Sequence, residues 1–486
     1  MSVTIQSNYP DGYEKDKVGK QVVFFKYTAD QLNREIPIDF IILIDKSGSM
    51  KGEKMIMLKA TIEYMIRHLS KVPKHNISLI SFNNEAEVNT GNDMVELIPE
   101  NEKYLLDILK TIEPSGSTNF GGALMEASKI INNRRTKNIP VILFLTDGHT
   151  NIDPMGWELI KYIKQLNFPK EIVLHTFAIG SDHDPVLLRK INNGSYFYIE
   201  TIDMIADTLL QAVNTSIRII SKNITLTIIG NKGCRIINSK LTNFPYEEVE
   251  YAKKYIYDFG NISDNESKSL NVTISINKGE AGTQQALTYI LKYTDSVSND
   301  EITNSYDYNI ERVSNIEIIP KPNFQLELEM YKYLIGNIMN NYIENTQLSY
   351  DKTIVDATLR EINEVNILLS KLSEEYLLHD DFKLLLYYMS KFKYIITEVR
   401  VCNECFIYIN VWTDMLLKQK YNCADKLKNI DTIINENNTK SRIVETLPSR
   451  RRIDISDVTA YNMSSKYVQT ADTRKEINRY VENYLF

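Results

Sequence analysis

Five oxygen-bearing residues in three segments carry the chemistry that this sequence suggests. An apolar run ends in Asp45-Lys46-Ser47-Gly48-Ser49, which puts a carboxylate and two hydroxyls on one turn. A glycine-rich segment, 115–122, contains Thr118 just before an expected helix. A second apolar run ends in Thr146-Asp147-Gly148. Carboxylate and hydroxyl oxygens are the ligands that hard cations such as Mg²⁺, Mn²⁺ or Ca²⁺ prefer, so these residues are candidates for one metal site.

These segments follow strands of an expected α/β fold. From Pro37 short apolar strands alternate with amphipathic helices, which predicts a doubly wound, mostly parallel sheet. We expect strands at 37–45, 76–82, 140–147, 171–180 and 196–199, and helices at 53–70, 104–112, 120–131, 155–163, from 185, and at 201–217. Because open α/β sheets bind ligands at the carboxyl ends of their strands, the three segments should meet at one edge. We expect the side chains of Asp45 and Thr118 to lie there on surface loops, outside the core.

The remaining chain divides by the period of its apolar residues. Period 2 at 224–228, 270–276 and 306–310 predicts a small antiparallel β-sandwich over 218–317. Helical periods predict an α-helical domain over 318–435, and 436–486 reads as a mobile connector with a terminal helix at 473–484. In the N-terminal segment, 1–36, a strand at 21–28 has no place in the α/β sheet and is a candidate to join the sandwich. We expect the region 37–217 to fold alone.

Composition excludes some classes of function. The 486 residues carry 56 basic and 63 acidic side chains, a net charge of −7, which disfavours a sequence-independent grip on nucleic acid. No apolar run approaches the ~20 residues that span a bilayer. The first twenty residues lack the apolar segment of a signal peptide, and four cysteines cannot form a disulfide framework. We therefore expect an intracellular, cytoplasmic protein.

The motifs D-x-S-x-S, a threonine in a glycine-rich loop and T-D-G, in this order, resemble the metal-ion-dependent adhesion site (MIDAS) of von Willebrand factor type A (VWA) domains. The resemblance is specific over 37–217, and one departure is Ala178 in place of a usual glycine. It implies that a divalent cation is held, directly or through water, by Asp45, Ser47, Ser49, Thr118 and Asp147. It also implies that the Asp or Glu of a partner protein completes the coordination. The order VWA domain, sandwich and helices is similar to that of a group of intracellular VWA proteins.

Two further groups of residues could have a function, but each also has a purely structural interpretation. His149, Asp182 and Asp184 fall near the same sheet edge and could tune the metal or touch a ligand, although we favour the interpretation that they are solvated polar residues of loops. Cys402 and Cys405, with Cys423, suggest half of a zinc site, but no second pair completes it. We favour thiols in a helical core.

Three functions are compatible with these motifs: a cation-dependent protein-binding module, a structural component in which the cation is only a staple, and a metal-assisted phosphohydrolase. The last is disfavoured because the sequence has no nucleophile elbow and no P-loop. Phosphatases with a similar strand end place a second carboxylate two residues after the first, where this chain has Ser47. We therefore expect a protein that is not an enzyme. The sequence does not indicate the partner or the oligomeric state.

Overall fold

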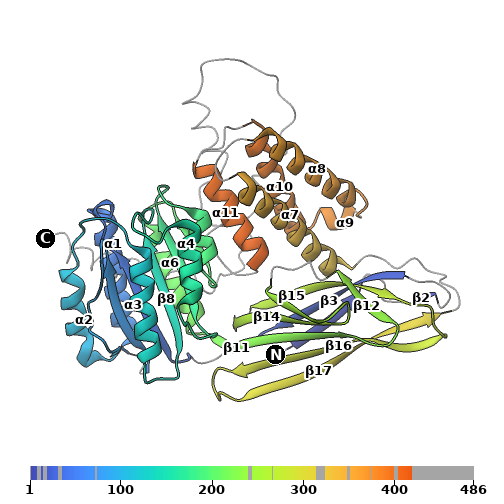
Figure 1. The fold of residues 1–486 in the computed structure, drawn as a ribbon, viewed down its shortest axis with the longest axis horizontal. Coiled ribbons are helices and arrows are strands. Elements are labelled where there is room, and N and C mark those ends of the chain that lie inside the picture. The colour runs from blue at the N-terminus through green and yellow to red at the C-terminus, as the bar shows by residue number, and fades with distance from the viewer. Residues whose placement is uncertain are drawn as a thin grey trace.

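The chain builds three regions, as a computed structural model shows (Figure 1). Most of the buried apolar residues that the structure describes belong to two large hydrophobic clusters. The structure describes residues 2–7, 13–14, 19–30, 35–71, 74–238, 244–264, 266–313, 323–346, 351–372, 374–398 and 403–418. An α/β region comes first, followed by a pair of mostly antiparallel sheets and then by helices. The predicted α/β fold class, with further antiparallel sheets and a helical C-terminal region, is confirmed.

The α/β region is built on a seven-stranded sheet with the order β10-β9-β8-β4-β5-β6, in which β7 also pairs with β5. Its five long strands run parallel: β4 (Ile38–Asp45), β5 (Asn76–Phe82), β8 (Ile139–Thr146), β9 (Val173–Ile179) and β10 (Tyr196–Ile199). The antiparallel additions β6 (Ala86–Val88) and β7 (Val95–Glu96) were not predicted, because strands of two or three residues have no readable period.

Helices cover both faces of this sheet. One set is α1 (Glu53–Leu69), α2 (Pro99–Thr111) and α6 (Met204–Ser216), in which α1 packs against the other two. The other set is α3 (Phe120–Asn133), α4 (Gly156–Gln165) and α5 (Pro185–Ile191), which pack in sequence. Because both faces are covered, every residue of β4 and β8 is buried, as expected for a parallel sheet.

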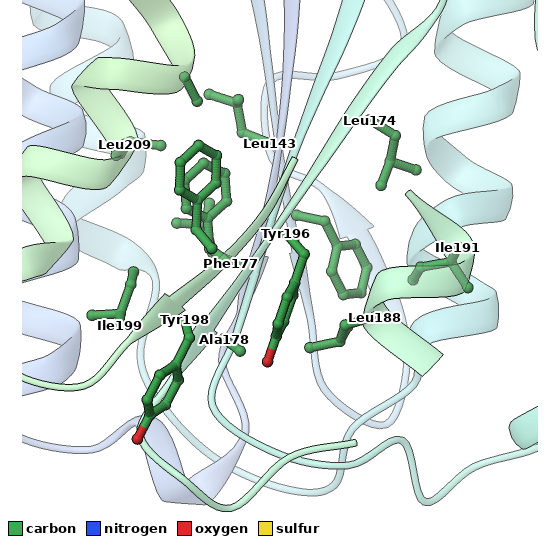
Figure 2. Packing of buried hydrophobic residues seen from close by; sticks show 14 of the residues in the cluster. Leu143, Leu174, Phe177, Ala178, Leu188, Ile191, Tyr196, Tyr198, Ile199 and Leu209 are labelled. Atoms are coloured by element: carbon green, nitrogen blue, oxygen red, sulfur yellow. The ribbon is translucent and has the colours of Figure 1, made fainter. Parts of the chain in front are cut away.

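The edge of the sheet near β9 and β10 shows this two-sided packing (Figure 2). Phe177 and Leu209 lie on one face of the strands, whereas Leu188, Ile191 and Tyr196 lie on the other. The rings of Phe177 and Phe197, on neighbouring strands, stack with centroids 4.9 Å apart. Aromatic side chains are therefore concentrated at the β9–β10 edge of the sheet, against which α11 packs.

Two further sheets share the second core. One has the order β1-β3-β15-β12, from β1 (Ser2–Ser7), β3 (Gly19–Thr28), β15 (Ser267–Ile276) and β12 (Cys234–Asn238). The other has the order β13-β14-β11-β16-β17-β2, from β13 (Tyr246–Glu250), β14 (Lys254–Ser263), β11 (Ile219–Gly230), β16 (Gly282–Asp295), β17 (Glu301–Val313) and β2 (Tyr13–Glu14). Phe25 of the first sheet stacks on Tyr289 of the second, with centroids 5.1 Å apart. The early strand β3 pairs antiparallel with β15, so the chain's N-terminal part lies in this region.

The C-terminal helices are α7 (Phe324–Thr346), α8 (Lys352–Leu369), α9 (Glu374–Leu377), α10 (Asp380–Glu398) and α11 (Asn403–Lys418). Most of their buried apolar residues belong to the same hydrophobic cluster as the α/β region, because α11 packs against α5 and β10. Cys405 is buried in α11. Cys402, Cys423, the predicted connector and the terminal helix lie outside the described residues.

Within the described residues, no helix is both long enough and apolar enough to cross a membrane.

Candidate metal centre

Asp45 is the last residue of β4, and its side chain is fully buried at the carboxyl edge of the sheet. The backbone N–H of Ser47 donates to Asp45 Oδ1 at 2.8 Å, and the Thr146 hydroxyl donates to Asp45 Oδ2 at 2.6 Å. Burial raises the pKa of Asp45 to about 6; the hydrogen bonds from Thr146 and Ser47 oppose this shift, and the charge of Asp147 adds to it. The ionised carboxylate is therefore costly here unless a positive charge accompanies it.

The two serines connect Asp45 to the other candidate carboxylate. A short 3-10 turn, Gly48–Met50, brings Ser49 over the end of the strand. The hydroxyl oxygens of Ser47 and Ser49 lie 3.1 Å apart, and Ser49 donates to Asp147 Oδ1 at 2.7 Å. Four of the five predicted ligands thus form one hydrogen-bonded cluster.

The glycine-rich loop is tied to this cluster through its backbone. Gly48 N donates to Gly116 O at 3.1 Å, and Ser117 N donates to the Asn84 side chain at 2.6 Å. Gly116 has a φ of +79°, and a Cβ there would lie 2.5 Å from Asn84 Oδ1, so only glycine fits. Asn84 follows β5 and so brings a third strand end to the site.

Thr118 is fixed by the loop that follows Asp147. Its N–H donates to Asn151 Oδ1 at 2.8 Å, and its carbonyl accepts from Asn151 N at 3.0 Å and from the Thr150 hydroxyl at 3.3 Å. None of these bonds uses the Thr118 hydroxyl. The fifth candidate ligand is therefore held in place by its backbone.

The expectation that Asp45 and Thr118 lie on surface loops is wrong. Asp45 is 0% exposed and Thr118 is 4% exposed. The reason is that the three loops are bonded to one another and fold over the strand ends. A cation here would be held mostly by buried oxygens, with Ser49 the exposed member of the set, and its attraction to the buried carboxylates is screened less than at the surface.

The second-rank candidates separate into two groups. His149 Nε2 lies 3.5 Å from Asp182 Oδ1, and both side chains are more than half exposed, at 53% and 97%. Asp184 instead caps α5, because its carboxylate accepts a hydrogen bond from Leu187 N at 2.9 Å. Only His149 and Asp182 stay free for a role at the rim of the site.

The sequence did not point to Lys54 or to the supporting asparagines. Lys54 Nζ lies 2.6 Å from Asp147 Oδ2, across 93 positions of the chain. Asn84 and Asn151 hold the glycine-rich loop through backbone groups. A search for oxygen ligands does not select a lysine, although the place of Lys54 five residues after Ser49 is a signal that could have been used.

The donor set suits a hard divalent cation. Two buried carboxylates and the nearby hydroxyls provide oxygen ligands with more negative charge than the single ammonium of Lys54 neutralises. The described part of the chain has no group of three or more His, Cys, Asp or Glu side chains placed to hold a metal, so a cation at this cluster would also need the hydroxyl oxygens. The cluster therefore fits Mg²⁺ or Mn²⁺ better than a soft cation.

Comparisons with known proteins concern the fold of this region. Residues 40–149 match the family model described as von Willebrand factor type A domain. Human inter-alpha-trypsin inhibitor heavy chain H2 is 27% identical over 213 residues, which are 41% of this chain and 22% of that protein. The chain thus spans about a fifth of the length of this curated relative.

Solved structures extend the likeness beyond the α/β region. A von Willebrand factor type A protein from Catenulispora acidiphila aligns with a TM-score of 0.57 at 16% identity, over 75% of this chain and 87% of that chain. The ArnB paralog VWA2 from Sulfolobus acidocaldarius aligns with a TM-score of 0.53 at 18% identity, over 85% of this chain and 97% of that chain. At such identities the likeness concerns the fold alone.

Proposed function

From the premise that the chain carries a VWA domain, we propose that it is a protein-binding module that depends on a divalent cation. The cation is Mg²⁺, Mn²⁺ or Ca²⁺, and it accepts an Asp or Glu side chain of a partner protein. The observation that carries the proposal is the pair of buried carboxylates, Asp45 and Asp147, joined through serine hydroxyls at the carboxyl edge of the sheet.

Each residue has a defined part in this proposal. Asp45 and Asp147 supply the charge, and Ser47, Ser49 and Thr118 supply neutral oxygens. Two carboxylates balance a divalent charge but do not fill the six positions that Mg²⁺ requires. The positions that water would otherwise fill can accept an anionic oxygen from outside, which is why we expect an acidic partner.

The histidines near this edge of the sheet, and Ser47 itself, argue against catalysis. His183, beside the rim, is buried and bonded through both ring nitrogens, to the Gly180 carbonyl and to the Tyr196 hydroxyl. His149 is exposed beside Asp182, and Ser47 stands where a second carboxylate would be needed. Because the described residues around the cluster include no positioned base or nucleophile, we expect no hydrolysis of phosphoesters with Mg²⁺ or Mn²⁺.

A structural staple is the alternative, and the burial of Asp45 favours it. The two functions differ in what the cation does for folding. A staple stabilises the protein strongly and leaves partner binding unchanged once the fold is kept. A binding site is needed for the partner even in a variant that folds without the cation.

The proposal also includes the cellular compartment in which the protein works. Cys234 and Cys405 are both buried, and four cysteines in 486 residues are too few for a disulfide framework, so we propose that the chain works in a reducing, intracellular compartment.

The test is capture of partners by the full chain in Mg²⁺, with release by a chelator and identification by mass spectrometry. Short peptides from a captured protein, each with one acidic residue and matched to an Asn or Gln version, then compete for binding. We expect only the acidic peptide to compete, and only with cation present. Capture that survives both chelation and the Asp45→Ala substitution would reject the mechanism.

A further inference from the structure

The site holds a positive charge of its own. Lys54 Nζ lies 2.6 Å from Asp147 Oδ2 and 3.5 Å from the carbonyl of Ser49. The Asp147 side chain is fully buried, whereas one third of the Lys54 side chain is exposed. Such a pair joins a carboxylate that cannot reach water to an ammonium that can, so Lys54 is able to leave or stay while Asp147 is fixed.

The two oxygens of Asp147 have different partners. Oδ1 accepts the Ser49 hydroxyl, which is itself beside Ser47 and so faces the proposed ligands. Oδ2 accepts the Lys54 ammonium. A cation bound through Oδ1 therefore would not need to displace Lys54, and the two positive charges would share one carboxylate.

The position of Lys54 in α1 has no local explanation. It is the second residue of the helix, and the helix dipole disfavours a cationic side chain in the first turn, where the neighbouring Glu53 is favourable. The contact with Asp147 supplies the stabilisation that the helix end does not. The lysine is thus explained by the site rather than by its own helix.

We propose that Lys54 is an internal counter-cation that sets the cation affinity of this site. In the metal-free protein it neutralises Asp147 and so stabilises the fold. In the loaded protein it repels the divalent cation and draws electron density from the ligand carboxylate, so it weakens cation binding. It also leaves the metal more attractive to an anionic ligand from a partner. This inference rests on the proposed metal site.

The test is titration of Mg²⁺ by calorimetry into the full-length wild type and Lys54→Met, with thermal melting of each protein in its metal-free form. Methionine keeps the length of the side chain and removes its charge. We expect Lys54→Met to bind Mg²⁺ about tenfold more tightly, within the range typical of groups that contact metal ligands. We also expect its metal-free form to melt below the wild type, because Asp147 loses its counter-charge.

Two matched variants isolate the charge at this position. Lys54→Arg keeps the charge and should resemble the wild type in both measurements. Lys51→Met removes the same charge from the same segment, but the Lys51 side chain is exposed, and the hydrogen bond of Lys51 to the Gly48 carbonyl comes from its backbone N–H. It should leave the affinity within about twofold of the wild type, since an exposed charge is well screened.

The outcomes separate the inference from the proposed function. Failure of the wild type to bind Mg²⁺ would overturn the metal site and this inference with it. Binding by the wild type with unchanged or weaker binding by Lys54→Met would overturn only the role of Lys54. An equal gain in Lys51→Met would mean that net charge, and not the contact with Asp147, controls the affinity.

Discussion

Strand β4 has a buried aspartate at each end, and the two ends differ in how the charge is neutralised. Asp39 and Asp45 are both 0% exposed. Asp39 accepts hydrogen bonds from the side-chain amides of Asn76 and Asn138, at 2.8 and 2.9 Å, and from the hydroxyl of Thr136. The guanidinium of Arg134 lies 3.6 Å from it.

Asp45 has fewer partners and no cation of its own. It accepts from the Ser47 N–H and the Thr146 hydroxyl, whereas the ammonium of Lys54 pairs with Asp147 and that of Lys46 with Glu87. Burial alone therefore does not identify a functional carboxylate. The amino end of β4 is a closed polar network that ties strands and loops together, whereas the carboxyl end carries negative charge in excess of its partners.

The largest effect on stability is expected at the closed end. Asp39→Ala removes the carboxylate to which Asn76, Asn138 and Thr136 donate, and with it the charge beside Arg134; Asn138 keeps its hydrogen bond to the Lys74 carbonyl. We expect a loss of about 3 kcal/mol in the free energy of unfolding, the range found when one partner of a buried charge network is removed. Urea denaturation of the full chain measures it. A decrease of less than about 1 kcal/mol in the free energy of unfolding would contradict the proposed difference between the two ends, because an ordinary hydrogen bond contributes that much.

At the carboxyl end of β4, substitution of the aspartate should increase stability instead of lowering it. The pKa of Asp45 is raised from 3.8 to about 6, so between these values the unfolded chain loses a proton that the folded, metal-free protein keeps. The contribution of Asp45 to stability is therefore present below about pH 4 and is lost as pH rises to about 6. Asp45→Asn removes this loss, since the Thr146 hydroxyl can accept from the new amide.

We accordingly expect metal-free Asp45→Asn to be more stable than the metal-free wild type by about 2 kcal/mol at pH 7.5, and no more stable at pH 4. Urea denaturation at both pH values provides the check. Equal destabilisation at both values would mean that Asp45 serves the fold as Asp39 does.

Thr118→Ala should have the smallest effect. The backbone bonds to Asn151 and Thr150 hold the loop without the hydroxyl, so the melting temperature should change little. Loss of one neutral ligand should weaken Mg²⁺ binding by about tenfold. Calorimetric titration measures this change. A melting temperature lowered by many degrees in saturating Mg²⁺ would instead favour a structural staple.

The sequence was sufficient to predict the architecture where the pattern of apolar residues extends over long segments. Eight-residue buried strands such as β4 and β8, separated by amphipathic helices, defined the α/β sheet and the edge at which its motifs meet. The packing between regions could not be predicted, because it depends on contacts far apart in the chain. Asp414 of α11, for example, accepts from Tyr196 N at 3.3 Å across 218 positions.

Independent folding of 37–217 stays a prediction. The contact between Asp414 and Tyr196 argues against it, because a fragment that ends at 217 lacks α11. Without α11 the fragment would expose the buried ring of Tyr198, which meets Tyr408 edge to face. The ligand types were likewise readable from D-x-S-x-S and T-D-G, but their burial was not. Burial comes from the bonds between three loops, such as that from Ser117 to Asn84, and no period of the sequence encodes them.

The central claim is that the carboxyl end of β4 is a divalent-cation site and its amino end is not. Calorimetric titration of Mg²⁺ at pH 7.5 into full-length wild type, Asp45→Asn and Asp39→Asn tests it most directly. We predict one bound Mg²⁺ in the wild type, binding at least about 100-fold weaker in Asp45→Asn, and near-normal binding in whatever fraction of Asp39→Asn is folded. A wild type that binds no Mg²⁺, or an Asp45→Asn variant that binds it as the wild type does, would contradict the account.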